Sequence, residues 1–179
     1  LPAGTRWGTT PGGSMDGINA LPLREDPAPY LDADAILYLS GADWDETRQG
    51  MLSGALQANP RPVVVANPDL VAPREGLLSV EPGAWAHALM DVAPRLDVHF
   101  FGKPFDNAFQ AVRSRLGDRM PPPDRVAMVG DTLHTDIRGG AAAGWGTVLI
   151  ADHGIFRGLE VAPFIAASGI VPDVIAATT

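Results

Sequence analysis

Short, uniformly apolar runs alternate with segments of helical spacing along most of this chain. Five runs have the length and composition of buried strands. They are Ala35–Leu39, Pro62–Ala66, Val98–Phe101, Val126–Val129 and Thr147–Ile150, and Val174–Ala176 is a candidate for a last one. Helices are predicted over Trp44–Asn59, Ala84–Val92, from Pro104 to about Leu116, and over Gly139–Ala143. Apolar strands separated by helices predict an α/β fold whose parallel sheet is covered on both faces.

The first thirty residues, Leu1–Tyr30, show neither pattern. They are rich in Pro, Gly and Thr and have no sustained helical or alternating period. We therefore expect loop, or at most a fragment of a strand, in this region. The tripeptide Gly13-Ser14-Met15 is interpreted as native sequence, because Asp16–Leu23 continues smoothly from it.

Composition and charge narrow the classes of protein that this chain can represent. Acidic residues outnumber basic ones by 21 to 13, and no Lys/Arg stripe is present, so nucleic acid is an unexpected partner. No apolar run is long enough to span a membrane, and no secretory signal opens the chain, so we expect a soluble, cytoplasmic protein. The absence of cysteine excludes disulfides, thiolate catalysis and cysteine-bound zinc.

The residues with the clearest chemical potential follow two of the predicted strands. Gly102-Lys103-Pro104 comes after Val98–Phe101, and Gly130-Asp131 to Thr135-Asp136 comes after Val126–Val129. The functional crevice of an open parallel sheet lies at the carboxyl ends of its strands. Asp131 and Asp136 are expected to converge there on one hard cation, for which magnesium is suited. Lys103 supplies a compact positive charge that can neutralise a phosphoryl oxygen.

Simpler roles compete with these assignments. Asp131 and Asp136 can be helix-start carboxylates, Lys103 can be a surface lysine, and Asn67-Pro68-Asp69 has the residue types of any turn. The histidines have no spacing typical of metal ligands, so core or surface roles are expected for them. They are His87, His99, His134 and His153.

The order of these motifs resembles that of the haloacid-dehalogenase-like phosphatases. Four stretches carry the resemblance. They are Ala66-Asn67-Pro68-Asp69, Pro82-Gly83-Ala84, Gly102-Lys103-Pro104 and Gly130-Asp131 to Thr135-Asp136. They are similar, in that order, to the class IIA branch that includes NagD-like and p-nitrophenyl-phosphatase-like enzymes. The resemblance runs from about Leu21 to Ile155.

This resemblance implies a magnesium-dependent hydrolase of small phosphorylated metabolites that works through an aspartyl-phosphate. Asp131 would be the metal carboxylate, with Asp136 supporting it at the metal site, and Lys103 would clamp the phosphoryl group and the nucleophile. Asn67 and Asp69 would bind substrate from a loop of the cap domain. The expected organisation is an α/β cap over residues 1–97 and a Rossmann-like half-core over residues 98–179.

The family's amino-terminal Asp-x-Asp-Gly motif is missing from this pattern. Asp16-Gly17 is the nearest match, but Ser14 stands in the place of the first aspartate and no apolar strand precedes it. We therefore expect a piece of a longer protein that lacks the nucleophile and is inactive alone. Removal of the nucleophile strand would leave an unpaired edge at Val126–Val129, which the missing amino-terminal segment, a second copy of the chain or a rearranged amino-terminal stretch would have to cover.

Two alternatives belong to other functional classes. The first is a catalytically silent interaction or regulatory module that keeps the fold and forms a homodimer through the cap. The second is a receiver-like domain, which also places acidic residues and a lysine at strand ends. The receiver is disfavoured because Lys103 precedes Asp131 and Asp136, whereas a receiver has its acidic residues first.

Overall fold

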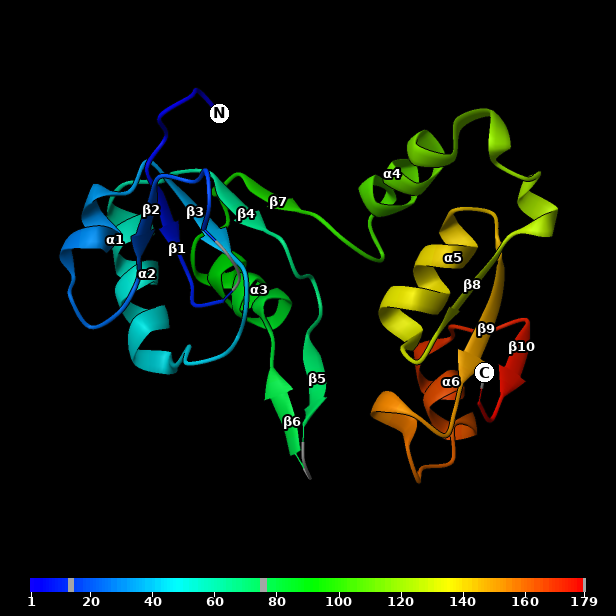
Figure 1. Ribbon diagram of the computed structural model, residues 1–179. Coiled ribbons are helices and arrows are strands. Elements are labelled where there is room, and N and C mark those ends of the chain that lie inside the picture. The colour runs from blue at the N-terminus through cyan, green and yellow to red at the C-terminus, as the bar shows by residue number, and fades with distance from the viewer. Residues whose placement is uncertain (13–14, 75–76, 179) are drawn as a thin grey trace. The chain divides into compact units, whose positions relative to one another are not determined.

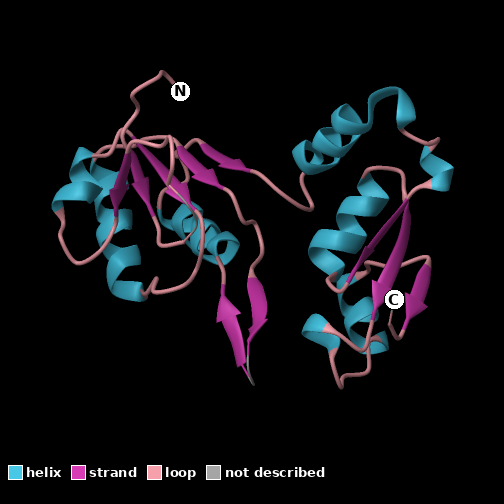
Figure 2. Cartoon of the chain, viewed as in Figure 1, coloured by secondary structure: helices cyan, strands magenta, loops and turns pink. Residues whose placement is uncertain are grey.

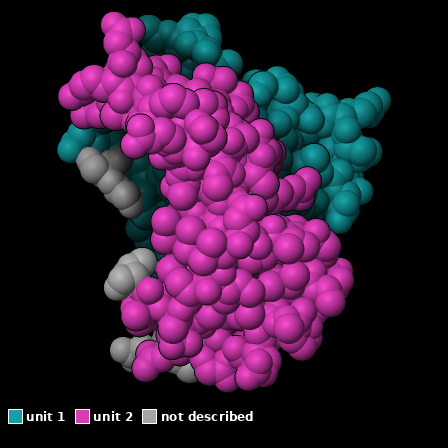
Figure 3. Space-filling view, turned by 90° about the vertical axis from the view of Figure 1, so that its right-hand side faces the viewer, with its two compact units in different colours: residues 1–101 teal, residues 102–179 magenta. Residues whose placement is uncertain are grey.

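The chain divides into two compact units in its computed structural model, which describes residues 1–12, 15–74 and 77–178. The first unit is Leu1–Phe101 and the second is Gly102–Thr179. Figure 1 labels their elements, Figure 2 separates helices from strands, and Figure 3 colours the two units. Both are built from strands and helices, so the predicted α/β class is confirmed.

A five-stranded parallel sheet forms the centre of the first unit, with the strand order β2-β1-β3-β4-β7. Its strands are β1 (Trp7–Thr9), β2 (Ala20–Pro22), β3 (Ala35–Tyr38), β4 (Val63–Val65) and β7 (Val98–Phe100). This is the doubly wound order 2-1-3-4-5, in which the chain reverses direction across the sheet between β1 and β3. The three later strands lie where the sequence predicts them.

Three helices connect these strands: α1 (Ala28–Asp32), α2 (Glu46–Ala58) and α3 (Pro82–Val92). Asp45 caps α2 by accepting a hydrogen bond from the Arg48 backbone N–H. The helices and one face of the sheet share a core of fully buried side chains. It includes Tyr30, Ile36, Tyr38, Leu52, Leu56, Val63, Val65, Ala86 and Leu89.

The opposite face of this sheet differs from expectation. Leu37 and Val64 point away from Ile36 and Val63, remain partly exposed and lie outside the shared core. The reason is the connection between β1 and β2, which has no helix in residues 10–12 and 15–19. The prediction that helices cover both faces is therefore wrong for the first unit.

The amino-terminal region is also more ordered than predicted. Residues 1–30 contain β1, β2 and the start of α1 instead of loop or a single strand fragment. Both strands are three residues long, and β1 pairs in register with β3, Gly8 lying beside Ile36. Tertiary pairing thus creates strands where the local pattern is too short to signal them.

A two-stranded antiparallel hairpin interrupts the connection between β4 and α3. It consists of β5 (Val71–Arg74) and β6 (Leu77–Val80), and the sequence pattern did not predict it. Leu77 is 75% exposed and Leu78 is 57% exposed. The hairpin therefore places apolar side chains in solvent at the carboxyl end of β4.

The second unit is a smaller three-stranded parallel sheet in the order β10-β9-β8. Its strands are β8 (Ala127–Gly130), β9 (Gly146–Ile150) and β10 (Val174–Ala176), and its helices are α4 (Asp106–Leu116), α5 (Arg138–Ala142) and α6 (Ala162–Ser168). A π-helical turn, η3 (Leu133–Ile137), precedes α5. Short 3₁₀ turns are η1 (Gly117–Arg119), η2 (Pro123–Arg125) and η4 (Gly154–Phe156).

Glycines let α5 pack closely in this unit. A Cβ atom on Gly139 would lie 2.6 Å from the Phe109 ring, and one on Gly140 would lie 2.6 Å from the Met128 Cβ. Both distances are too short for real side chains. This confirms the interpretation of the small residues from Gly139 onward as a close helix-to-sheet contact.

The boundary between the units lies four residues later than the predicted start of the half-core. β7 pairs with β4 and so belongs to the first sheet, and the second unit begins at Gly102. The roles of these units as cap and half-core stay predictions. Among the residues that the structure describes, no helix has the length and apolarity that a membrane span requires.

Candidate functional site

Lys103 and Asp136 form an ion pair at the carboxyl edge of the second sheet. The Lys103 Nζ donates to Asp136 Oδ1 at 2.5 Å, although the two residues are 33 positions apart. Lys103 precedes α4, and Asp136 lies in the π-helical turn after β8. The Asp136 side chain is 3% exposed, whereas that of Lys103 is 44% exposed. The lysine thus keeps a solvent-accessible side while a buried carboxylate holds it.

The second oxygen of Asp136 is also occupied. Asp136 Oδ2 accepts from the Thr132 backbone N–H at 3.1 Å, and Ile137 N–H bonds to Thr132 O across the π-helical turn. Such turns frequently occur at functional sites, because they redirect a side chain within a helix. In this structure both Asp136 oxygens therefore have partners from the protein, which suits a residue that orients Lys103.

Gly130 makes room for this arrangement. A Cβ atom at Gly130 would lie 2.1 Å from Asp136 Cγ, which is shorter than any real contact. Gly130→Ala is therefore expected to displace Asp136 and to destabilise the protein by about 1–3 kcal/mol, as overpacking of a filled site does. The free energy of unfolding in urea measures the change.

Gly146 offers a matched control on the neighbouring strand. A Cβ atom there would meet Val126 O at 3.5 Å, which is an ordinary van der Waals distance. Gly146→Ala should change the free energy of unfolding by less than about 1 kcal/mol. Equal losses in the Gly130→Ala and Gly146→Ala variants would contradict a specific role for Gly130.

Asp131 lies at the end of β8, beside the residues that hold Lys103. Its Oδ1 accepts from the Thr132 hydroxyl at 3.2 Å. Its Oδ2 packs against Gly154 of the loop after β9, where a Cβ atom would lie only 1.4 Å away. Gly154 has φ +63° in the left-handed region, and both this backbone and the close approach require glycine. Two strand ends therefore shape the surroundings of Asp131.

The atoms at this edge that could bind a metal ion are oxygens, and oxygen ligands suit a hard cation such as magnesium. Asp131 would hold the ion through its carboxylate. Asp136 would support the site through Lys103 and Thr132, since both of its oxygens already accept hydrogen bonds. Within residues 1–12, 15–74 and 77–178, no three His, Cys, Asp or Glu side chains gather as a metal site. Magnesium commonly binds through one or two carboxylates, with substrate phosphate and water as its other ligands.

The predicted substrate-binding residues Asn67 and Asp69 form a tight turn after β4. The Asn67 Oδ1 accepts from the Asp69 N–H at 3.1 Å, and the Asn67 amide donates to Glu81 Oε2 at 3.2 Å. Asn67 thus shapes the turn at the carboxyl edge of the first sheet. Binding of substrate by Asn67 and Asp69 stays a prediction.

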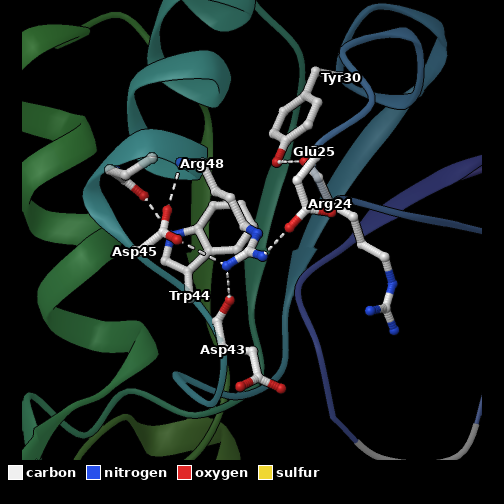
Figure 4. A network of polar contacts seen from close by, with 8 residues as sticks. Arg24, Glu25, Tyr30, Asp43, Trp44, Asp45 and Arg48 are labelled. Atoms are coloured by element: carbon white, nitrogen blue, oxygen red, sulfur yellow. Dashed lines mark hydrogen bonds and ion pairs between the residues drawn. The ribbon is translucent and has the colours of Figure 1, made fainter.

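Two turns of the first unit carry aspartates, Asp16 and Asp43, whose surroundings bear on the missing nucleophile. Ser14, which stands in the family position of the first aspartate, lies outside the described residues. Asp16 is exposed, and the strand before it, β1, ends at Thr9. Asp43 follows β3 with φ +55°, and its backbone carbonyl accepts from the Arg48 guanidinium. Figure 4 shows the Asp43 carboxylate turned away from Arg48.

Arg48 itself is part of a polar network that holds the loop after β3. Its Nη2 donates to Glu25 Oε1 at 2.5 Å and its Nη1 donates to Asp45 Oδ2 at 2.9 Å (Figure 4). The hydrogen bond to Glu25 raises the pKa of the Arg48 guanidinium above its ordinary value. The arginine therefore stays charged and ties the loop to the segment after β2.

Two residues that shape the site in the second unit were not predicted from the sequence. Thr132 donates to both aspartates, through its backbone N–H to Asp136 and through its hydroxyl to Asp131. Gly154 packs against Asp131 from the next strand end. Gly154 could have been found, because it lies in the loop after β9. This strand was predicted, and the carboxyl ends of parallel strands meet at one edge of a sheet.

The comparisons with known proteins agree with this geometry. A family described as HAD-hydrolase-like matches residues 100–177, which include Lys103, Asp131 and Asp136. No curated protein matches the sequence significantly. Among solved structures, a possible sugar phosphatase of the HAD superfamily from Cytophaga hutchinsonii is 26% identical, with a TM-score of 0.77 over 98% of this chain.

Two further solved structures share the fold at lower identity. A p-nitrophenyl phosphatase from Archaeoglobus fulgidus is 21% identical over 97% of this chain, with a TM-score of 0.70. A 4-nitrophenylphosphatase from Thermotoga maritima is 18% identical over 97%, with a TM-score of 0.68. This chain spans 65%, 64% and 62% of the three solved chains, which is less than two thirds of each. The predicted resemblance is confirmed, since residues 100–177 match the HAD-hydrolase-like family and most of the chain shares the fold of solved HAD phosphatases.

Proposed function

We propose that this chain is part of a magnesium-dependent phosphomonoester hydrolase that acts on small phosphorylated metabolites through an aspartyl-phosphate. The observation that carries the proposal is the pairing of Lys103 with buried Asp136 beside Asp131, at the carboxyl edge of a parallel sheet. The site thus combines one cation, Lys103, with one carboxylate, Asp131, that has no basic partner among the described residues. This combination fits a phosphoryl group bridged to a metal ion.

Each residue has a separate task in this proposal. Lys103 contacts a phosphoryl oxygen with its exposed side and neutralises the charge that builds there during transfer. Asp136 keeps the Lys103 Nζ in place, and Thr132 holds both carboxylates through its hydrogen bonds. Asp131 would hold magnesium, which supplies charge neutralisation at the phosphate. The nucleophile would come from a segment that carries the family's Asp-x-Asp-Gly motif.

This division of labour predicts that the 179 residues alone do not hydrolyse phosphate esters. The isolated chain should release no p-nitrophenol from p-nitrophenyl phosphate above background with magnesium present. Co-expression with the nucleophile-bearing segment of the same protein should restore turnover, and intact mass identifies the chain ends. Robust turnover by the isolated chain would overturn the assignment and direct the search to Asp16, Asp43 and Asp69.

A second candidate function is a catalytically silent module that dimerises through the first unit. The exposed leucines of the β5–β6 hairpin favour it, because contiguous apolar side chains in solvent mark contact surfaces. The same assay separates the two candidates. If the chain stays inactive with every partner segment while Leu77→Ser converts a dimer into a monomer, the interaction module is the better description.

A further inference from the structure

Glu81 is a buried carboxylate for which the proposed chemistry has no use. It is 3% exposed and lies at the start of α3, where it makes no side-chain cap hydrogen bond to the helix. Its side chain instead accepts three hydrogen bonds. Ser79 Oγ donates to Oε1 at 2.6 Å, Arg74 Nη2 donates to Oε1 at 3.0 Å and Asn67 Nδ2 donates to Oε2 at 3.2 Å. A buried charge is tolerated only with such partners.

The three donors come from different segments of the carboxyl edge of the first sheet. Arg74 and Ser79 belong to the two strands of the hairpin, and Asn67 belongs to the turn after β4. The Glu81 backbone N–H also bonds to Leu70 O, at the exit of that turn. One side chain therefore joins the hairpin to the turn that contains Asn67 and Asp69.

Close backbone contacts show how tightly this junction is packed. A Cβ atom on Gly83 would lie 2.0 Å from Pro68 O, and one on Gly41 would lie 2.1 Å from Val80 O. Gly83 N–H also bonds to Asp69 O. The start of α3, the turn after β4 and the loop after β3 thus meet without spare volume around Glu81.

We propose that Glu81 is a positioning residue for substrate binding, acting through Asn67 on the turn that presents Asp69. Hydrogen bonds from Arg74 and Ser79 hold one oxygen of the carboxylate, so the other oxygen has a fixed direction toward the Asn67 amide. Asn67 then holds the Asp69 N–H through its own carbonyl. The inference rests on the proposed function, because Asn67 and Asp69 are predicted to bind the substrate of that phosphatase.

The Glu81→Gln substitution tests this relay with little change in volume. Glutamine offers one acceptor oxygen and places an NH₂ group among three donors, so the Asn67 amide or the hairpin loses its partner. In the complete enzyme we expect KM to rise by about tenfold, as a charge-assisted hydrogen bond is lost, with kcat within about twofold. Glu46→Gln makes the same change at an exposed glutamate at the start of α2 and should leave KM within about twofold.

A double-mutant comparison and a spectroscopic readout distinguish positioning from general destabilisation. If Glu81 acts through Asn67, the Glu81→Gln change should have no further effect on KM in an Asn67→Ala background. In the complete ¹⁵N-labelled protein, Glu81→Gln should shift the Asn67 side-chain amide signals and speed hydrogen exchange at the Asp69 amide. Glu46→Gln should leave both unchanged.

The possible failures can be told apart. Unchanged Asn67 signals and unchanged Asp69 exchange in a folded Glu81→Gln variant would overturn the inference. If those signals move while Asn67→Ala and Asp69→Ala leave KM unaltered, the relay exists but its link to substrate is wrong. If Glu81→Gln unfolds, Asn67→Ala carries the test alone, and it must raise KM and speed Asp69 exchange for the inference to stand.

Discussion

Asp131→Ala is expected to abolish magnesium-stimulated phosphate release by the complete enzyme. Asp131 lies at the end of β8 and is the carboxylate of the second-unit site that has no basic partner among the described residues. Removal of one hard ligand weakens the metal site and leaves the phosphate charge uncompensated. Phosphate release as a function of magnesium concentration measures the effect, and circular dichroism shows whether the fold survives.

Asp152 supplies the matched control for this experiment. It is an exposed aspartate in the loop after β9, at the same edge of the second sheet. Asp152→Ala removes an equal charge and should leave the magnesium dependence unaltered. Normal magnesium-stimulated turnover in Asp131→Ala would show that the metal assignment is wrong.

Lys103→Ala is expected to lower kcat by about a hundredfold or more, since it removes a preorganised charge from the phosphoryl site. Lys103→Arg should recover little activity, because the planar guanidinium does not replace a compact ammonium group held by Asp136. Arg138→Ala is the control, since Arg138 is an exposed cation at the start of α5 in the same unit. Activity of Lys103→Ala near that of the unaltered enzyme would return Lys103 to a surface role.

The composition of the chain allows Lys103 to be labelled selectively. Lys103 is the sole lysine among the 179 residues. Reductive ¹³C-methylation therefore introduces one side-chain NMR signal, apart from that of the amino terminus. Its chemical shift reports whether Lys103 and Asp136 remain paired in the variants of Asp131.

The strands that precede the residues of the second-unit site were predictable, because local patterns located them. The apolar runs before Lys103 and Asp131 became β7 and β8, but β7 pairs in the first sheet, so the rule of shared strand ends does not account for the ion pair between Lys103 and Asp136. The division of labour between the carboxylates was not predictable. It depends on the π-helical turn that aims Asp136 at Lys103, and no residue pattern specifies such a turn.

The first unit shows the limits of local patterns. β1 is a strand because it pairs with β3, and β2 is one because it pairs with β1, whereas the three residues of each carry too little signal of their own. The β5–β6 hairpin includes Pro73 and a run of leucines that fits no alternating period. The role of Glu81 could not be predicted from the sequence either, because only folding brings Asn67, Arg74 and Ser79 to its carboxylate.

The unequal cores of the two units have a thermodynamic consequence. Among the described residues, the core of the first unit comprises thirteen buried side chains, whereas the main cluster of the second comprises Leu133, Ile137, Leu149 and Phe156. The free energy of unfolding grows with buried apolar area. The unit that holds Lys103 and Asp131 is therefore expected to unfold at a lower temperature. A single melting temperature therefore does not describe this chain. On warming, the ion pair between Lys103 and Asp136 would be lost while the first unit is still folded.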